Sequence, residues 1–227
     1  MGRGSGEVKL AAPSQKPVLE MVPNYWLRAM RASPHVTEAN FLRALASAAL
    51  ATALLEEPGA KVPVVGKIAV LDALVRQQSD PVFALRLGRS CEVRFGSVLS
   101  YILFSSATVG PALANVCDFA RLTRPRSRLE LINVGYSLEF RLEHPDPAVQ
   151  AAHAYREFAI GNIVRSFEVA TQNPIRPRCV HLAASIGSRA DDVGKALGCA
   201  VHDGAGHTAI VFSKQVAATR IASSDEL

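Results

Sequence analysis

The stretch RLELINVGYSLEFRLE, residues 128–143, decides the fold class of this chain. In its second half apolar or aromatic residues occupy every other position: Tyr136, Leu138, Phe140 and Leu142. This period of two is typical of a β-strand with one buried face. Asn133-Val134-Gly135 separates the strand from an apolar run before it, which predicts a β-hairpin. Since the segments before the hairpin follow a helical period, the chain changes here from helices to strands.

The residues before the hairpin, from about 21 to 122, are predicted to be helical. Between 41 and 53, apolar residues recur at spacings of three and four. A second helical run begins after Pro63 and stops before Ser79-Asp80-Pro81, where Asp80 is expected to cap another helix. Residues 1–20 are rich in Gly, Ser, Pro and Lys, and we expect them to form a flexible leader.

After the hairpin, helices and strands alternate over about 123–222. The predicted elements are a long helix over 147–171, a strand over 179–184, a short helix from Ser188 to Gly198, and a second hairpin across Asp203-Gly204. This order, ββ-α-β-α-ββ after a helical segment, is typical of an α+β fold with helices packed on a small sheet.

Length and composition are those of one folded domain, which we place at 21–227. The chain has 227 residues, of which 49% are hydrophobic. A length of this order allows a sizeable core. No uncharged apolar run reaches the roughly 18 residues that a membrane span needs. The four cysteines are far apart and no secretory signal precedes them, so we expect a soluble cytoplasmic protein with reduced thiols.

The net charge of +5 permits contact with a polyanion without requiring it. The densest basic group consists of Arg121, Arg124, Arg126 and Arg128. We interpret it as a solvated loop, and a surface for phosphate groups is the alternative.

Signatures of catalysis and of metal binding are absent from the sequence. It contains no GxSxG, HExxH or phosphate-loop motif, and no two histidines are three or four residues apart. We therefore expect no enzyme activity, no cofactor and no metal site. His181 alternates with Cys179 and Ala183 on the strand at 179–184, so an imidazole in the core and an imidazole that binds a ligand both stay open.

Several longer segments, taken in order, resemble one family. They are VPVVGKIAVLDALVRQQSDPVFALRLGR (62–89), FGSVLSYILFSSATVGPALANVCDFARL (95–122), the hairpin with the helix after it, and the closing run from HLAAS at 181 to AATRI at 221. Together they resemble the N-terminal effector-sensing domain of AraC/XylS-type bacterial transcription regulators, in the branch with an arabinose-binding-like domain. The chain departs from the family pattern at HLAASIG, which lacks the usual aromatic residue and proline.

The resemblance implies a ligand-sensing regulatory domain that binds a small-molecule effector and forms a homodimer. Such regulators continue into a DNA-binding module of two helix-turn-helix units, on the order of 100 residues long. We expect this chain to lack that module, either because it stops at the linker or because it is a stand-alone sensor. Contact with DNA is therefore expected only through the missing module.

Candidate ligand-binding residues are those with aromatic or imidazole side chains on faces predicted to point inward. They are Tyr101, Phe104, Tyr136, Phe140, Tyr155, Phe158 and His181. An apolar or amphipathic effector fits such a lining better than a sugar. Two other classes of function compete with the sensor: a stand-alone enzyme or cofactor-binding protein that uses His153 or His181, and a module that only oligomerises.

Overall fold

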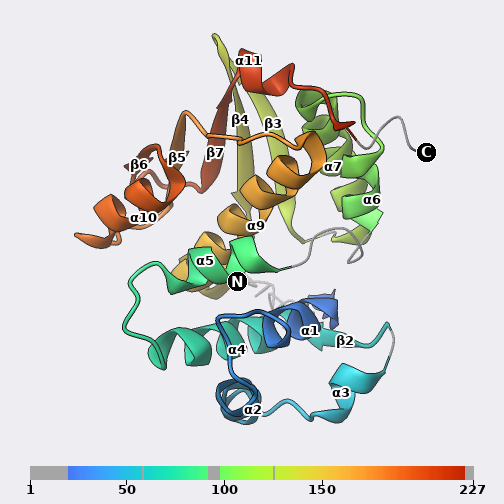
Figure 1. Ribbon diagram of the computed structural model, residues 1–227, viewed down its shortest axis with the longest axis vertical. Coiled ribbons are helices and arrows are strands. Elements are labelled where there is room, and N and C mark those ends of the chain that lie inside the picture. Colours follow the sequence, from blue (N-terminus) through green and yellow to red (C-terminus); the bar gives the residue numbers. More distant parts are fainter. Residues whose placement is uncertain (1–19, 58, 92–97, 125, 223–227) are drawn as a thin grey trace, which may run out of the picture.

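The computed structural model describes residues 20–57, 59–91, 98–124 and 126–222. Figure 1 shows two lobes, a helical lobe below and a lobe with a five-stranded sheet above. Mixed helices and strands confirm the predicted α+β class. The expected leader lies outside the described residues except for Glu20, which is buried. No helix among the described residues is long and apolar enough to span a bilayer.

The helical lobe is built by the residues before position 91. Its helices are α1 (Tyr25–Arg31), α2 (Glu38–Ser47), α3 (Ala53–Glu56), α4 (Val64–Arg76) and α5 (Phe83–Ser90). Two short strands that the sequence analysis did not predict, β1 (Met21–Pro23) and β2 (Lys61–Pro63), pair antiparallel beside them. Three residues are too few to show a period of two. Phe41, Leu45 and Leu71 are fully buried in the core of this lobe.

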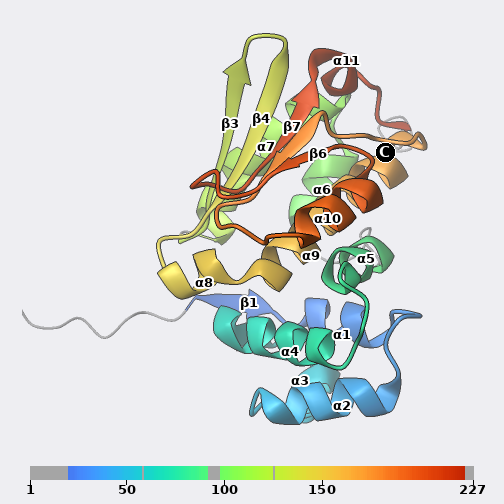
Figure 2. The ribbon, with the colours of Figure 1, turned by 90° about the vertical axis from the view of Figure 1, so that its left-hand side faces the viewer.

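The second lobe consists of a five-stranded sheet and the helices that follow position 97. The helices are α6 (Val98–Phe104), α7 (Val109–Thr123), α8 (Pro147–Ala151), α9 (His153–Thr171), α10 (Arg189–Leu197) and α11 (Lys214–Ala217). The strands are β3 (Arg128–Val134), β4 (Ser137–Glu143), β5 (Cys179–His181), β6 (Ala200–His202) and β7 (Ala209–Ser213), in the spatial order β3-β4-β7-β5-β6. Figure 2 shows α6 and α7 behind this sheet.

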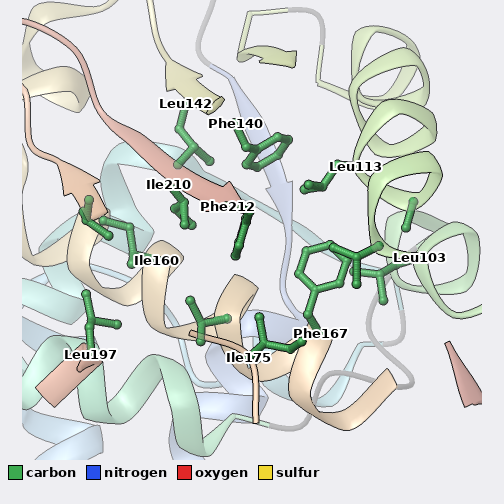
Figure 3. Packing of buried hydrophobic residues seen from close by; sticks show 14 of the residues in the cluster. Leu103, Leu113, Phe140, Leu142, Ile160, Phe167, Ile175, Leu197, Ile210 and Phe212 are labelled. Carbon is green, nitrogen blue, oxygen red and sulfur yellow. The ribbon is translucent and has the colours of Figure 1, made fainter. Parts of the chain in front are cut away.

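The first hairpin is confirmed. β3 and β4 pair antiparallel from Arg128–Glu143 to Val134–Ser137, and Gly135 turns the chain with a φ of 55°. The sheet side of the core is visible in Figure 3, where Phe140 and Phe212 face Leu113 of α7 and Phe167 of α9. The rings of Phe167 and Phe212 meet edge to face with centroids 6.0 Å apart.

The prediction of a second hairpin across Asp203-Gly204 is wrong, because β6 and β7 do not pair with each other. β6 lies parallel beside β5, while β7 pairs antiparallel with the other side of β5 and with β4. The loop between β6 and β7 crosses the end of β5, since the amides of Ala205 and Gly206 donate to the carbonyls of Leu182 and Ala183. The predicted strand at 179–184 accordingly ends at His181.

The helix predicted over 147–171 is divided at Ala152, whose ψ of 89° is not helical. α8 turns Val149 into the core of the helical lobe, whereas Ile160 and Phe167 of α9 belong to the core under the sheet. Because the helix breaks at Ala152, residues 147–171 contribute side chains to the cores of both lobes.

α5 and α9 cross at very short range and hold the two lobes together. A Cβ atom added to Gly88 would lie 2.1 Å from the carbonyl oxygen of Phe158, and one added to Gly161 would lie 2.3 Å from that of Leu85. Asn162 also donates to the carbonyl of Gly88 at 3.2 Å. Only glycine fits at these two positions because backbone atoms, not movable side chains, fill the space.

Candidate functional site

A cavity of about 150 Å³ lies where the two lobes meet. Trp26 and Lys67 reach it from the helical lobe, α6 and α7 contribute Leu103 and Leu113, and α9 forms a long part of its wall. Aliphatic and aromatic side chains dominate that wall: Leu103, Leu113, Val116, Phe140, Leu142, Phe158 and Phe167. A largely apolar cavity with a few polar groups is the usual form of a small-molecule site.

Lys67 is the most unusual group in the wall. It is only 4% exposed, and its ammonium lies 4.4 Å from the ring centre of Trp26 and 5.0 Å from those of Tyr155 and Phe158. Burial holds the pKa of Lys67 well below its ordinary value, and the nearby Arg124 lowers that pKa further, while the charges of Cys91 and Glu20 act in the opposite direction. Among the described residues no carboxylate or carbonyl accepts a hydrogen bond from it. Within the described ranges, aromatic rings therefore surround the cation, and no carboxylate forms a hydrogen-bonded ion pair with it.

Further hydrogen-bond donors around the cavity also lack acceptors. The indole N–H of Trp26 and the Nε–H of Arg156 are buried without a partner in the part of the chain that the structure describes. The other guanidinium nitrogens of Arg156 donate to the carbonyl of Leu142 and to Gln150. Unpaired buried donors cost free energy, so they favour an occupant that supplies acceptor oxygens.

A buried polar network borders the same cavity. His144 lines the wall, and its Nε2 contacts Glu20 at 2.6 Å. Its Nδ1 accepts from the amide of Asp146, so Nε2 carries the hydrogen and donates to Glu20. Glu20 also accepts from Ser127 at 3.1 Å. These groups already form hydrogen bonds with one another, whereas Trp26 and Arg156 each keep a donor without an acceptor among the described residues.

The structure divides the seven predicted ligand residues. Phe140, Tyr155 and Phe158 line the cavity, and their contact with a ligand stays a prediction. Phe104 packs against the core under the sheet without reaching the wall.

The predicted inward orientation is wrong for two tyrosines. Tyr136 is 87% exposed because it lies in the turn of the first hairpin, beyond the paired strands, and Tyr101 is 63% exposed on α6. His181 lies on the sheet face opposite the core, away from the cavity.

Sequence reasoning missed Trp26, Lys67 and Arg156. For Lys67 a signal existed, since it stands three residues after Val64 and four before Leu71, on the stripe of α4 that is buried. A lone lysine at helical spacing within an apolar stripe is a candidate for burial, although lysines are seldom fully buried. Arg124 is the one member of the basic group that lines the cavity, whereas Arg121 and Arg128 are exposed beside carboxylates.

Two groups of side chains elsewhere have the composition of metal ligands. Glu139, His181 and His207 form one group and Cys179, His181 and His202 the other, with the ligand atoms of each group within 4.8 Å of one another. Spacing along the chain predicted no metal site, because pairing between strands, rather than helical spacing, brings these residues together.

Comparison with known proteins agrees with this architecture. Residues 39–221 match the model of the arabinose-binding N-terminal domain of AraC transcription regulators. No curated protein sequence gives a significant match. The crystal structure of the transcriptional regulator CdpR from Pseudomonas aeruginosa is similar to this chain, with a TM-score of 0.56 at 16% identity over 83% of its residues. The chain spans 59% of that regulator's length. It therefore belongs to the arabinose-binding N-terminal domains of AraC transcription regulators, which are ligand-sensing regulatory domains.

Proposed function

We propose that this chain senses a small organic anion with an apolar body, which binds in the cavity between the lobes. The observation that carries the proposal is the buried ammonium of Lys67, which faces three aromatic rings and donates no hydrogen bond to a carboxylate among the described residues. Glu20 acts on it through its charge alone. Cation–π contacts stabilise such a group by about 0.5–2 kcal/mol, less than the cost of removing a full charge from water. A carboxylate from a ligand supplies the missing stabilisation.

The charges of the wall favour an anion. Lys67, Arg124 and Arg156 line the cavity together with one carboxylate, Glu143. The unpaired N–H groups add two hydrogen-bond donors for the ligand, a neutral one from the indole of Trp26 and a cationic one from the guanidinium of Arg156. A monocarboxylate offers four lone pairs to such donors.

The rest of the wall favours a hydrophobic body. Apolar cavities of comparable volume take up a benzene ring. Arabinose, the sugar in the family's description, carries hydroxyl groups all round its ring that need hydrogen-bond partners. Ser100, Asn162 and Ser166 line part of the wall, but the part formed by Leu113, Phe140 and Phe167 has no partner to offer. We therefore place small aromatic or branched aliphatic acids ahead of sugars.

Ligand binding would act on the contact between the lobes. Trp26 and Lys67 come from the helical lobe and Phe140 from the sheet, so an occupant touches both. A ligand that favours one arrangement shifts the population toward it. In a whole regulator this shift would control a DNA-binding module outside this chain. We infer a cytoplasmic homodimer without catalytic activity, in which DNA is contacted by that module alone.

Exposed apolar residues support a dimer interface on α7. Leu122 is 78% exposed and Phe119, one turn before it, is 44% exposed. Apolar patches of this kind on the surface often mark contacts between proteins. An α7 face paired with its copy would bury both side chains.

Ligands of similar size, one charged and one neutral, test the proposal together with the sugar. Thermal unfolding of the chain is measured with benzoate, with benzyl alcohol, which is similar in shape and neutral, and with L-arabinose, and then with a panel of other small carboxylates and their alcohols. We expect a carboxylate to raise the melting temperature and its alcohol to have a smaller effect. A panel in which neutral compounds or arabinose stabilise as well as the acids would contradict an anion sensor.

A further inference from the structure

The strand pairing gathers polar side chains on the face of the sheet turned away from the core. Arg141, Ala209, His181 and His202 are direct neighbours across β4, β7, β5 and β6, so they point to the same side. The intervening row, with Phe140, Ile210 and Val180, points into the core and is at most 2% exposed. Ala209 carries only a methyl group between Arg141 and His181, which leaves room for larger side chains to meet above it.

We propose that Glu139, His181 and His207 bind a divalent transition-metal ion, most suitably Zn²⁺. Two imidazoles and one carboxylate are a donor set that zinc accepts, with water as the fourth ligand. The site lies on the sheet face opposite the cavity, and none of its three residues lines that cavity. It therefore does not depend on the proposed effector site.

The distances between the donor atoms suit a tetrahedral ion. Nδ1 of His181 lies 3.2 Å from Nε2 of His207, and that nitrogen lies 2.9 Å from a carboxylate oxygen of Glu139. Zinc–nitrogen bonds of 2.0–2.1 Å at tetrahedral angles place neighbouring donors about 3.3 Å apart. The side chains need only small rotations to receive the ion.

The orientation of His207 is that of a metal ligand. Its Nδ1 lies 3.1 Å from the carbonyl oxygen of Ala205. Because a carbonyl oxygen only accepts, Nδ1 carries the hydrogen, and in the neutral ring Nε2 presents a lone pair to Glu139 and His181. Ligating histidines commonly donate their second N–H to a backbone carbonyl in this way. In that tautomer Nε2 of His207 and the carboxylate of Glu139 both act as acceptors, and a cation between them removes their repulsion.

His181 is held from its other side. Its Nε2 lies 3.7 Å from the sulfur of Cys179, and the ring of His202 packs against it edge to face at 5.4 Å. These contacts leave Nδ1 directed at His207. The group Cys179, His181 and His202 shares His181 with the proposed site. We prefer Glu139 and His207 as partners because His202 is exposed, whereas the side chains of Glu139 and His207 are 8% and 24% exposed.

Arg141 is the cation that competes for Glu139. Its Nε donates to the carboxylate oxygen that also faces His207, at 2.6 Å. Glu130 and Glu143 also act on Arg141, so its charge is shared among three carboxylates. No described residue donates a hydrogen bond to the second oxygen of Glu139, so a rotation of the carboxylate can leave one oxygen with Arg141 and turn the other toward His207 and the ion.

The test is a zinc titration of the whole 227-residue chain in competition with a chromophoric chelator. We expect one ion per chain, a higher melting temperature with zinc, and reversal of that shift by EDTA. Glu139→Gln and His207→Ala should each weaken binding at least about 10-fold, since even outer-shell changes have effects of that size. His35→Ala, which removes an exposed histidine elsewhere, should leave the affinity unchanged. Cys179→Ser, next to His181, should weaken binding less than His207→Ala does.

Two results would overturn the proposal. In the first, His207→Ala and Glu139→Gln both bind zinc as tightly as the wild type. Zinc would then bind elsewhere, and a proton rather than a metal ion would lie between these groups. The other is loss of binding in Cys179→Ser with full binding in His207→Ala, which would place the ion at Cys179 and His202. Circular dichroism of each metal-free variant checks that it is folded, and His207→Ala changes a loop residue with little effect on the core.

Discussion

The ammonium of Lys67 lies 4.4 Å from the centre of the Trp26 ring, in the wall between the lobes. Trp26 itself meets Phe158 of α9 edge to face, with ring centroids 5.6 Å apart. The lysine, the indole and the helix that joins the lobes therefore form one unit. A ligand that binds the lysine acts directly on the contact between the lobes.

Replacing Lys67 by methionine should stabilise the unliganded chain. The substitution keeps most of the buried stem and removes the desolvated charge, so the free energy of unfolding should rise by about 1–3 kcal/mol. Urea unfolding at pH 7 measures this. Lys195→Met is the matched control, because Lys195 is 79% exposed, and it should have little effect. Equal stability of Lys67→Met and wild type would mean that the cation is compensated within the chain.

The same lysine predicts how stability changes in alkali. Burial lowers the folded-state pKa of Lys67 below the unfolded value of 10.5. The folded state loses its proton first, so the stability of the wild type relative to Lys67→Met should increase as the pH rises toward 10.5. Unfolding curves of both proteins at several pH values above 7 test the sign. A gap between the two proteins that stays constant with pH would contradict it.

Glu157 predicts a pH dependence of stability near neutrality. Burial raises its pKa to about 7, although Arg189 contacts both carboxylate oxygens, at 2.7 and 2.8 Å. The folded state therefore holds this proton more tightly than the unfolded state, whose pKa is near 4.5. Stability from this group is complete below pH 4.5 and is lost as the pH rises to 7, by on the order of 2–3 kcal/mol.

Glu157→Gln should remove this decline. Chemical denaturation of the variant and the wild type between pH 4.5 and 8 is the measurement, and the difference between them should shift in favour of the variant as the pH rises. Parallel stability curves would show that Arg189 keeps Glu157 ionised throughout.

The crossing of α5 and α9 predicts opposite effects for two glycine substitutions. Gly88→Ala places a methyl group against the backbone of Phe158 and should destabilise the chain by about 2–3 kcal/mol. Gly66→Ala in α4 meets only the side chain of Leu50 at 3.4 Å, and its higher helix propensity should stabilise by about 0.5–1 kcal/mol. Thermal unfolding compares both. Similar losses at the two sites would argue against a backbone clash at Gly88.

Leu122 tests the proposed dimer. Leu122→Glu places a charge on the exposed apolar face of α7 and should convert a dimer into monomers, as measured by light scattering at several concentrations. Val134→Glu, in a β3 residue that is 51% exposed, is the control. A dimer that survives Leu122→Glu would place the interface elsewhere.

The parts of the fold that depend on neighbouring residues could be predicted from the sequence. The first hairpin follows from the alternation around Phe140 and from Gly135, both within one short stretch. The pairing of β6 could not be predicted, because β5, 20 residues earlier at Cys179–His181, inserts between β6 and β7. Asp203-Gly204 is a turn in either arrangement, so local chemistry does not decide between them.

The residues of the cavity could likewise be predicted only where neighbouring positions in the sequence decide. Tyr155 and Phe158 could be chosen for their type and helical position, whereas Tyr136 continued the alternation of a strand past its end and is exposed. The role of Lys67 depends on three rings contributed by α1 and α9, which are separated from it by about 40 and 90 residues. No window of sequence contains that relationship.

Calorimetric titration of the wild type, Lys67→Met and Lys195→Met with the most stabilising carboxylate of the panel tests the central claim most directly. The account predicts one site per chain, an affinity at least about 10-fold weaker in Lys67→Met, which corresponds to about 1.4 kcal/mol, and wild-type affinity in Lys195→Met. Equal affinity of Lys67→Met and the wild type would contradict an anion site at this lysine.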